Sequence, residues 1–315
     1  MSCKVAFIGA GNMGREHIRA FADIPGVQLT GIYTRTPLRA EELIKEFSFT
    51  KGVLSTIEEL YTVTKADLVV IAVPELSVRA VCSEVFKYPW TCLVEKPVGY
   101  NLEDASSIYE AALANNTKVL VALNRRHYSV TKQLLAEIHD NEQPRLIHVF
   151  DQEDPAQALA GGQPELVVKN WMYANSIHMI DYLTVLGRGN ILSVEPVIKW
   201  NPTHPSFVVS RITYDSGDIG IYEAVWNAPG PWAVTVSTQS SRWELRPLEK
   251  LSIQKYGSRK QHILEADEND KRFKPGLRVQ AEEAIKAVLK KNNSSATLED
   301  SMKLMQLIKR IYNTN

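Results

Sequence analysis

A turn with three glycines near the amino terminus constrains the fold of this chain more than any other feature. The apolar run 3–8 leads into Gly9-Ala10-Gly11-Asn12-Met13-Gly14 and then into a segment with helical spacing. Gly9 permits the tight turn, Gly11 lets a pyrophosphate approach the backbone, and Gly14 lets the helix pack close to the strand. The helix amino terminus, near Asn12, presents free N–H groups to phosphates. The pattern predicts a dinucleotide site that includes Met13, with a strand-turn-helix without ligand as the alternative.

The composition is that of an ordinary globular protein. The 315 residues suit two domains, and 44% of them are hydrophobic. Lys and Arg number 36, as do Asp and Glu, so we expect neither a nucleic acid nor a membrane as partner. The three cysteines form no C-x-x-C pair and fit a reducing cytoplasm, and the first residues form a strand rather than a signal peptide. The histidines lack metal-ligand spacing, so no metal is expected.

The first half alternates strand-like and helix-like segments, which predicts a parallel sheet with right-handed crossovers. The strand candidates are 4–8, 27–33, 67–72, 91–94 and 118–123. The helix candidates are 14–22, 39–47, 57–61, 77–86 and 102–114, the last with Asn101 as its N-cap. We therefore assign residues 1–123 to an α/β dinucleotide-binding domain of the Rossmann type.

After residue 123 the pattern is that of an α+β domain, residues 124–315, with a large, mostly antiparallel open sheet. Its strand candidates are 146–150, 193–199, 207–214, 219–226, 233–237, 242–246 and 250–255. Its helix candidates are 130–138, 171–186, 276–289 and 297–312, with a loop at 154–164, and the last helices are free to pack back on the first domain. An open sheet with one uncovered face suggests self-association, so we expect a homodimer or homotetramer through this sheet.

The end of the second strand indicates which dinucleotide is bound. About 20 residues after the glycines, an acidic side chain normally holds the ribose 2′-hydroxyl of NAD. This chain has Thr34-Arg35-Thr36 there and no carboxylate. Arg35 would attract a 2′-phosphate and stack on adenine, while Thr34 and Thr36 can donate hydrogen bonds. We therefore expect NADP, with NAD as the second choice and a solvated loop arginine as the alternative for Arg35.

A lysine follows the fourth strand of the first domain. Ligands of open α/β sheets bind at the carboxyl ends of the strands, which places Glu95, Lys96 and the segment Ala72-Val73-Pro74 at the cofactor. A lysine that is partly desolvated there has a lowered pKa and can exchange a proton with a hydroxyl while hydride moves. A surface Glu-Lys pair before a proline is the alternative.

Together these motifs resemble the glucose-fructose oxidoreductase / inositol dehydrogenase / MocA family. The resemblance covers nearly the whole chain, and its elements are the glycine turn, Glu95-Lys96-Pro97, Asn124-Arg125-Arg126, a helix with His178, and the tail from Lys274-Pro275-Gly276-Leu277 to Leu298-Glu299-Asp300-Ser301. It implies that Lys96 is catalytic, that Asn124 contacts the nicotinamide, that Arg126 holds an anionic part of a substrate, and that the cofactor lies between the domains.

The helix at 171–186 carries further candidates and one departure from the family pattern. At helical spacing Asn175, His178 and Asp181 share one stripe, while the apolar residues of the helix can face a core. His178 is expected to be catalytic, donating to a substrate hydroxyl or acting as acid or base, and Asn175 to contact the substrate. The family usually has an aspartate four residues before this histidine, where this chain has Ala174. Lys96 with His178 must then do more of the proton chemistry.

These observations predict an NADP(H)-dependent oxidoreductase. Hydride would pass between nicotinamide and a hydroxyl or keto carbon of a sugar, a cyclitol or a nucleotide-linked sugar, with Lys96 as the main proton donor or acceptor. A non-catalytic regulator that senses cofactor or sugar is one alternative, because Ala174 replaces the aspartate. A reductase of a non-sugar carbonyl or imine is another.

Overall fold

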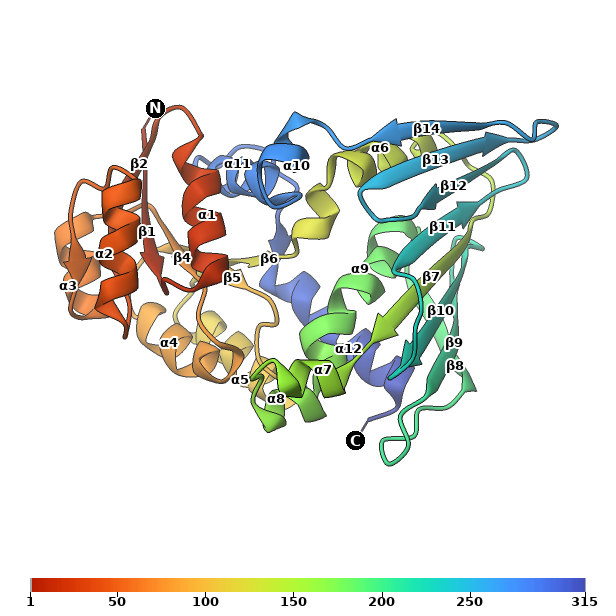
Figure 1. The fold of residues 1–315 in the computed structure, drawn as a ribbon, viewed down its shortest axis with the longest axis horizontal. Helices are drawn as coiled ribbons and strands as arrows, with labels where there is room; N and C mark the ends of the chain where they lie inside the picture. Colours follow the sequence, from red (N-terminus) through yellow and green to blue (C-terminus); the bar gives the residue numbers. More distant parts are fainter. Residues whose placement is uncertain (1, 315) are drawn as a thin grey trace. The chain divides into compact units, whose positions relative to one another are not determined.

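The computed structural model describes residues 2–314, which divide into two compact units. The first unit contains residues up to 127 and again 269–302, and the second contains 128–268 and the residues from 303 onward. The chain therefore passes from one unit to the other three times, the last time within helix α12 (Leu298–Tyr312). Figure 1 shows the elements of both units.

The first unit is built on a sheet of seven strands in the order β15-β6-β5-β4-β1-β2-β3, in which only β15 is antiparallel to its neighbour. Its strands are β1 (Cys3–Ile8), β2 (Val27–Tyr33), β3 (Val53–Leu54), β4 (Leu68–Ile71), β5 (Thr91–Glu95), β6 (Lys118–Ala122) and β15 (Ala296–Thr297). Strand β4 is buried at every residue, as expected of a strand covered by helices on both faces. The predicted parallel sheet is therefore confirmed.

Helices connect and cover these strands. They are α1 (Asn12–Ala22), α2 (Pro37–Glu46), α3 (Ile57–Thr64), η1 (Glu75–Ser77), α4 (Val78–Val85), α5 (Leu102–Ala114), η2 (Asn124–His127), α10 (Glu268–Arg272) and α11 (Leu277–Val288). Helices α1, α2 and α11 share one apolar core with the face of β1 that carries Val5 and Phe7. Asn101 caps α5 as predicted, because its side chain accepts a hydrogen bond from the backbone N–H of Asp104 at 2.8 Å.

Helix α11 comes late in the sequence but belongs to the first unit. It packs against α1, and the Arg278 side chain donates to Asp23 Oδ2 at 2.8 Å. Lys118 Nζ donates to the carbonyl of Ala287 at 2.6 Å, which ties the end of α11 to β6. Strand β15 then pairs with β6 and extends the sheet by one antiparallel strand. The first unit is thus completed by residues far from the glycine turn in sequence.

The second unit is built on an eight-stranded sheet in the order β14-β13-β12-β11-β7-β10-β9-β8. Its strands are β7 (Leu146–Glu153), β8 (Ile191–Ile198), β9 (Phe207–Tyr214), β10 (Ile219–Trp226), β11 (Ala233–Ser237), β12 (Ser241–Leu245), β13 (Lys250–Lys255) and β14 (Gln261–Glu265). All pairs are antiparallel except β7 with β10. Burial alternates strictly along β10, so one face of the sheet is buried and the other is partly exposed. The expected open, mostly antiparallel sheet is confirmed.

The helices of this unit differ in part from the sequence prediction. They are α6 (Ser129–Ile138), α7 (Pro155–Ala160), α8 (Glu165–Lys169), a π-helical turn η3 (Met172–Ser176), α9 (Ile177–Leu186) and the later part of α12. The loop prediction for 154–164 is wrong over α7, because Asp154 caps a short helix by accepting from Gln157 N at 2.8 Å, and Pro155 suits its first position. The helix predicted at 171–186 is present but begins with the π turn.

Two acidic side chains lie on the buried face of β7. Asp151 and Glu153 are two residues apart, so they point to the same side of the strand, and they are 2% and 0% exposed. Burial, together with the neighbouring Asp151 carboxyl, raises the pKa of Glu153 well above its ordinary value. Glu153 therefore holds its proton at pH values where an exposed glutamate has lost it.

Hydrogen bonds connect this acid pair to the neighbouring elements. Asn175 Nδ2 donates to Glu153 Oε2 at 2.8 Å, and Ser176 Oγ donates to Glu153 Oε1 at 3.0 Å. The Tyr222 hydroxyl donates to Asp151 Oδ2 at 2.7 Å. The acid pair thus joins β7 to the π turn before α9 and to β10.

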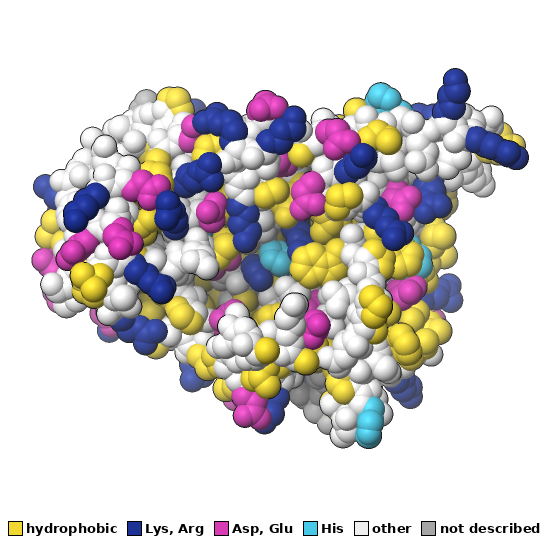
Figure 2. Space-filling model, viewed as in Figure 1, with side chains coloured by type: hydrophobic (Ala, Val, Ile, Leu, Met, Phe, Trp, Pro, Cys, Tyr) yellow, Lys and Arg dark blue, Asp and Glu magenta, His cyan; other side chains and the backbone are white. Residues whose placement is uncertain are grey.

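Charged side chains of both signs are mixed on the surface. Figure 2 shows basic and acidic side chains interspersed over the visible face, in keeping with the equal numbers of the two kinds in the sequence. Within residues 2–314, none of the helices combines the length and the apolar character needed to cross a bilayer.

The raised pKa of Glu153 predicts how stability depends on pH. Above the pKa of the unfolded chain, about 4.3, and below the raised folded value, the folded state binds more protons than the unfolded state. The free energy of unfolding therefore falls as the pH rises through this window. Gln at position 153 has no proton to lose. The melting temperature of Glu153→Gln relative to wild type should increase from about pH 5 to about pH 8, as thermal unfolding at each pH would measure.

Glu142 offers the matched control, because it is an exposed glutamate in the same unit. For Glu142→Gln we expect a difference in melting temperature that changes little with pH. A difference for Glu153→Gln that stays constant or shrinks on going to alkaline pH would contradict the prediction.

Candidate active site

The glycine turn after β1 is close-packed on two sides and open on the third. A Cβ on Gly9, whose φ is +101°, would lie 2.2 Å from the carbonyl oxygen of Ala72, and a Cβ on Gly14 would lie 2.4 Å from that of Gly9. A Cβ on Gly11 would meet no atom within 4 Å. Gly9 and Gly14 are therefore required by the packing of strand and helix, whereas Gly11 borders open space that a ligand could fill.

The helix that follows the turn presents its amino terminus there. Helix α1 begins at Asn12, its first turn contains no acidic side chain, and no side chain caps it. Its first N–H groups and its dipole therefore favour an anion. Lys274, from the segment between α10 and α11, reaches this end of the helix, where its Nζ lies 3.2 Å from Met13 Sδ. Sequence reasoning gave Lys274 no role, because only the return of the chain to the first unit brings it here.

The segment after β2 carries the residues predicted to choose between NAD and NADP. Arg35 is exposed, and its Nη2 donates to Ser77 Oγ at 3.4 Å. The backbone N–H of Thr36 donates to Thr34 Oγ1 at 3.3 Å. The acidic residue that would mark an NAD site is absent between Tyr33 and Arg39 in the sequence. The expected preference for NADP at this segment stays a prediction.

The end of β4 forms the other side of the turn. The backbone N–H of Ala72 donates to the carbonyl of Ile8 at 2.9 Å, which continues the sheet by one residue beyond β4. Val73 is partly buried and Pro74 is exposed. Because β1 and β4 are parallel neighbours, this segment and the glycine turn meet at the same edge of the sheet.

Lys96 directly follows β5 at that edge. Its side chain is partly buried, and burial lowers the pKa of its amine, with Arg125 acting in the same direction and Glu95 in the opposite one. An amine whose proton is less tightly held can serve as a base as well as an acid nearer to neutral pH. Lys96 therefore has the properties expected of a proton-transfer group, while its role itself stays a prediction.

Glu95 is the last residue of β5, and both of its carboxylate oxygens have partners. His17 Nε2 of α1 lies 2.6 Å from Oε1, and the backbone N–H of Lys96 donates to Oε2 at 3.2 Å. His17 is 1% exposed. Sequence reasoning missed His17, although a histidine three residues after the last glycine, on the buried side of α1, is a readable signal.

Residues of η2 lie at the end of β6, the next parallel strand. Asn124 is buried, and its Nδ2 donates to the carbonyl of Pro275 at 2.9 Å. This bond anchors the segment before α11, so the amide of Asn124 has a structural partner besides the predicted nicotinamide. Arg126 is partly exposed, whereas its neighbour Arg125 is buried. The parallel register of β5 with β6 places both strand ends at the same edge as Lys96.

The candidates of the second unit lie around the π turn. His178 is partly exposed on α9, while Ile177, Ile180 and Leu183 of the same helix are fully buried. Asp181, the third residue of the predicted polar stripe, is 3% exposed, so the expected division of this helix into two sides holds only in part. Asn175 is partly buried and donates to Glu153, an interaction that the sequence did not suggest. Ala174 is buried and, having no polar side-chain atom, cannot supply the missing aspartate's function.

The structure thus collects the predicted residues of the first unit at the carboxyl ends of β1, β2, β4, β5 and β6. His178 and Asn175 belong to the second unit.

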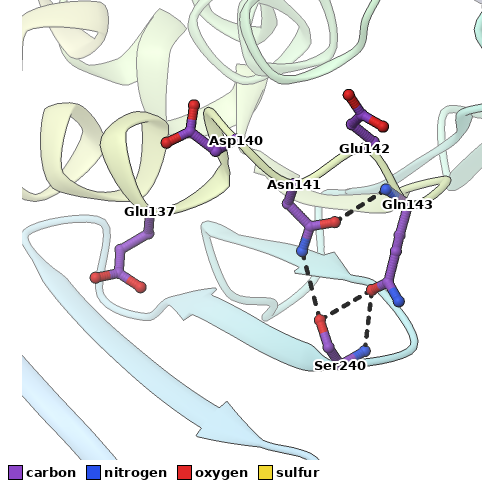
Figure 3. Close-up of a pocket in the computed structure, with 6 residues that line it drawn as sticks. All are labelled: Glu137, Asp140, Asn141, Glu142, Gln143 and Ser240. Atoms are coloured by element: carbon purple, nitrogen blue, oxygen red, sulfur yellow. Dashed lines mark hydrogen bonds between the residues drawn. The ribbon is translucent and has the colours of Figure 1, made fainter.

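A pocket of about 500 Å³ in the second unit contains none of the predicted site residues. It is lined by Glu137, Asp140, Asn141, Glu142, Gln143 and Ser240. Figure 3 shows that its uncharged side chains bond one another, as in the 2.9 Å bond from Ser240 Oγ to Gln143 Oε1.

Comparisons with solved structures agree with this fold. UDP-N-acetylglucosamine 3-dehydrogenase from Acidithiobacillus ferrooxidans aligns over 99% of this chain and 97% of its own, with a TM-score of 0.78 and 16% identity. A dehydrogenase from Chromobacterium violaceum aligns over 99% and 95%, with a TM-score of 0.81 and 17% identity. At these identities the likeness shows the shared fold.

Comparisons of the sequence find a partial relative and a family model that matches the first domain. Glucose-6-phosphate 3-dehydrogenase of Bacillus subtilis (strain 168) is 25% identical over 146 residues, which are 46% of this chain and 41% of that protein. The chain thus matches less than half the length of this curated relative. Residues 3–123 match the model of GFO_IDH_MocA, described as an oxidoreductase family with an NAD-binding Rossmann fold. Residues 3–123 of this chain are thus similar to the Rossmann domain of the Gfo/Idh/MocA oxidoreductases.

Proposed function

We propose that this protein is an NADP(H)-dependent oxidoreductase that acts on a hydroxyl or keto carbon of a sugar, a cyclitol or a nucleotide-linked sugar. The observation that carries the proposal is the partly buried Lys96 at the sheet edge that also holds the glycine turn. The names of the relatives support the substrate class, since they include 3-dehydrogenases of glucose-6-phosphate and of UDP-N-acetylglucosamine.

The residues of the first unit fit a dinucleotide. The open space at Gly11 would admit a pyrophosphate, and the uncapped amino terminus of α1 would donate N–H groups to it, with the Lys274 ammonium nearby. Once bound, the nicotinamide would supply or accept the hydride. Ala72, Val73 and Pro74 would border the cofactor on the β4 side, and Asn124 on the β6 side.

The proton is handled by side chains of this protein. In the oxidative direction we assign Lys96 the removal of the proton from the substrate hydroxyl, and in the reductive direction its return. The lowered pKa of this amine makes both protonation states accessible closer to neutral pH. We assign His178 a hydrogen bond to a substrate hydroxyl and Arg126 an anionic part of the substrate. Asn175, which Glu153 holds, would then present its carbonyl oxygen to the substrate.

Replacing Lys96 tests this assignment. Lys96→Met should lower kcat by about 10²- to 10⁴-fold, the range for loss of a general acid or base, because methionine keeps the length of the side chain but carries no proton. The cofactor should still bind, as calorimetry would show. Turnover is measured from nicotinamide absorbance on sugar phosphates, cyclitols and nucleotide-linked sugars.

Lys51, which is exposed in the same unit, supplies the control Lys51→Met, for which no loss of turnover is expected. Full turnover in Lys96→Met would remove this lysine from the mechanism. A wild-type protein that binds the cofactor but turns over none of these compounds would favour a sensing role.

The preference for NADP rests on Arg35. We expect Arg35→Ala to weaken NADP binding by about 10- to 100-fold, because a charge-assisted hydrogen bond to a phosphate contributes about 1.5–3 kcal/mol. Binding of NAD, which has no 2′-phosphate, should change little. Calorimetry with both cofactors measures this, and Arg39→Ala, at another exposed arginine four residues later, should leave both affinities unchanged. Wild-type protein that binds NAD as tightly as NADP would rule out the preference.

We also propose that two or more copies associate through the exposed face of the second unit's sheet. Exposed apolar side chains of this sheet include Leu146 on β7, Ile198 on β8 and Phe207 on β9. In the strand register Phe207 lies opposite Val225, which extends the apolar surface onto β10. Covering such a surface with a second copy removes it from water.

Sedimentation velocity tests this association. The wild-type protein should sediment as a dimer or tetramer, and Phe207→Glu should shift it toward the monomer, because a carboxylate resists burial in an apolar contact. Leu38→Glu is the control, since Leu38 is 73% exposed but belongs to the first unit. A wild-type protein that sediments as a monomer over the whole concentration range would exclude the proposal.

A further inference from the structure

A buried histidine contacts the acidic residue that precedes the proposed catalytic lysine. His17 lies on α1, three residues after Gly14, and is 1% exposed. Its Nε2 is 2.6 Å from Oε1 of Glu95, whose side chain is 10% exposed. A carboxylate only accepts hydrogen bonds, so the ring nitrogen donates, and a bond of this length is typical of a charge-assisted pair.

The second oxygen of the same carboxylate faces Lys96. The backbone N–H of Lys96 donates to Glu95 Oε2 at 3.2 Å. The charge of Glu95 raises the pKa of the Lys96 amine and so opposes the effects of burial and of Arg125, both of which lower it. The position of this one carboxylate therefore influences how readily Lys96 gives up its proton.

A carboxylate at the end of a strand can adopt more than one rotamer unless its oxygens are held. In this structure the partner that holds Oε1 comes from α1, while Oε2 is held by the backbone that follows β5. The contact with His17 spans 78 positions in sequence and ties the helix of the glycine turn to the strand that carries Lys96.

We propose that His17 is a positioning residue, which holds the Glu95 carboxylate beside Lys96 and thereby sets the charge environment of the proton-transfer group. This inference rests on the proposed function only in treating Lys96 as the reacting group. The contact itself joins residues of one unit. His17 acts through Glu95 and needs no contact with the substrate.

The test is a titration of Lys96 in the protein without substrate. Lysine labelled with ¹³C at the ε position is followed by NMR as a function of pH, and the Lys96 resonance is identified by its absence in Lys96→Met. In His17→Leu the Glu95 side chain is released, so the pKa of Lys96 should fall by about 1 unit, toward the value set by burial together with the charges of Arg125, Glu75 and Lys274. Glu95→Gln should have the same effect, and the double variant should be no different from Glu95→Gln.

Three further variants separate positioning from a general loss of stability. His17→Gln keeps an N–H that can reach Glu95 and should restore the wild-type titration. His17→Asn is too short to reach Glu95, so it should show the same lowered Lys96 pKa as is expected for His17→Leu. It replaces His17→Leu in the test if the leucine variant fails to fold. Thr30→Val removes a different buried hydrogen bond of this unit, from Thr30 Oγ1 to the carbonyl of Val5 at 2.9 Å, and should leave Lys96 unchanged.

The outcomes for the two proposals are distinct. A Lys96 titration that is the same in wild type, His17→Leu and His17→Asn would overturn the positioning role, whatever the turnover. An absence of turnover on every compound tested would count against the proposed function and would leave the titration interpretable. Where turnover is found, the acid limb of kcat/KM in the oxidative direction should move to lower pH in His17→Leu and should return in His17→Gln.

Discussion

The close approach of two backbone segments at the glycine turn is the constraint on which the first unit depends. Gly9 passes the carbonyl of Ala72 at a distance that leaves no room for a side chain, and Gly14 passes the carbonyl of Gly9 in the same way. These contacts fix where α1 begins and how it lies against the sheet. They therefore also determine that His17, one turn further along α1, reaches Glu95 at the end of β5. The same packing therefore places the uncapped amino terminus of α1 beside the glycine turn and connects α1 to the strand that precedes Lys96.

Much of this architecture could be predicted from periodicity alone. Continuous apolar runs predicted β1 and β4, because strands buried on both faces leave this pattern. The alternating burial along β10 could not be read from its sequence, since IGIYEAVW is apolar on both faces. Strand β3 was missed because Val53–Leu54 is too short to show a period. Helix α7 was missed because Gly and Pro nearby indicate a loop, although the cap at Asp154 favours a helix.

Some features of the candidate site could likewise be predicted from the sequence, and others could not. Residues at strand ends, such as Arg35 and Lys96, could be located because the topology of a parallel sheet places all carboxyl ends at one edge. The partners of these residues could not, because they depend on tertiary contacts. Lys274 reaches the glycine turn only through the late return of the chain, and Asn175, expected to face a substrate, also donates to a buried glutamate on a different strand. Sequence thus placed the candidate site residues at strand ends better than it identified the residues that contact them.

The interleaving of the two units has a consequence for how the protein is made. Strand β15 completes an edge of the first sheet, and α11 covers one of its faces, yet both are synthesised after the whole of the second sheet. Until residues 277–297 have been synthesised, β6 lacks its neighbour β15, and the apolar side chains that α11 covers have no partner on that helix. The first unit therefore cannot reach its complete form before the second sheet has been synthesised. Deleting residues 277–297 would damage the first unit, although its glycine turn lies at residues 9–14.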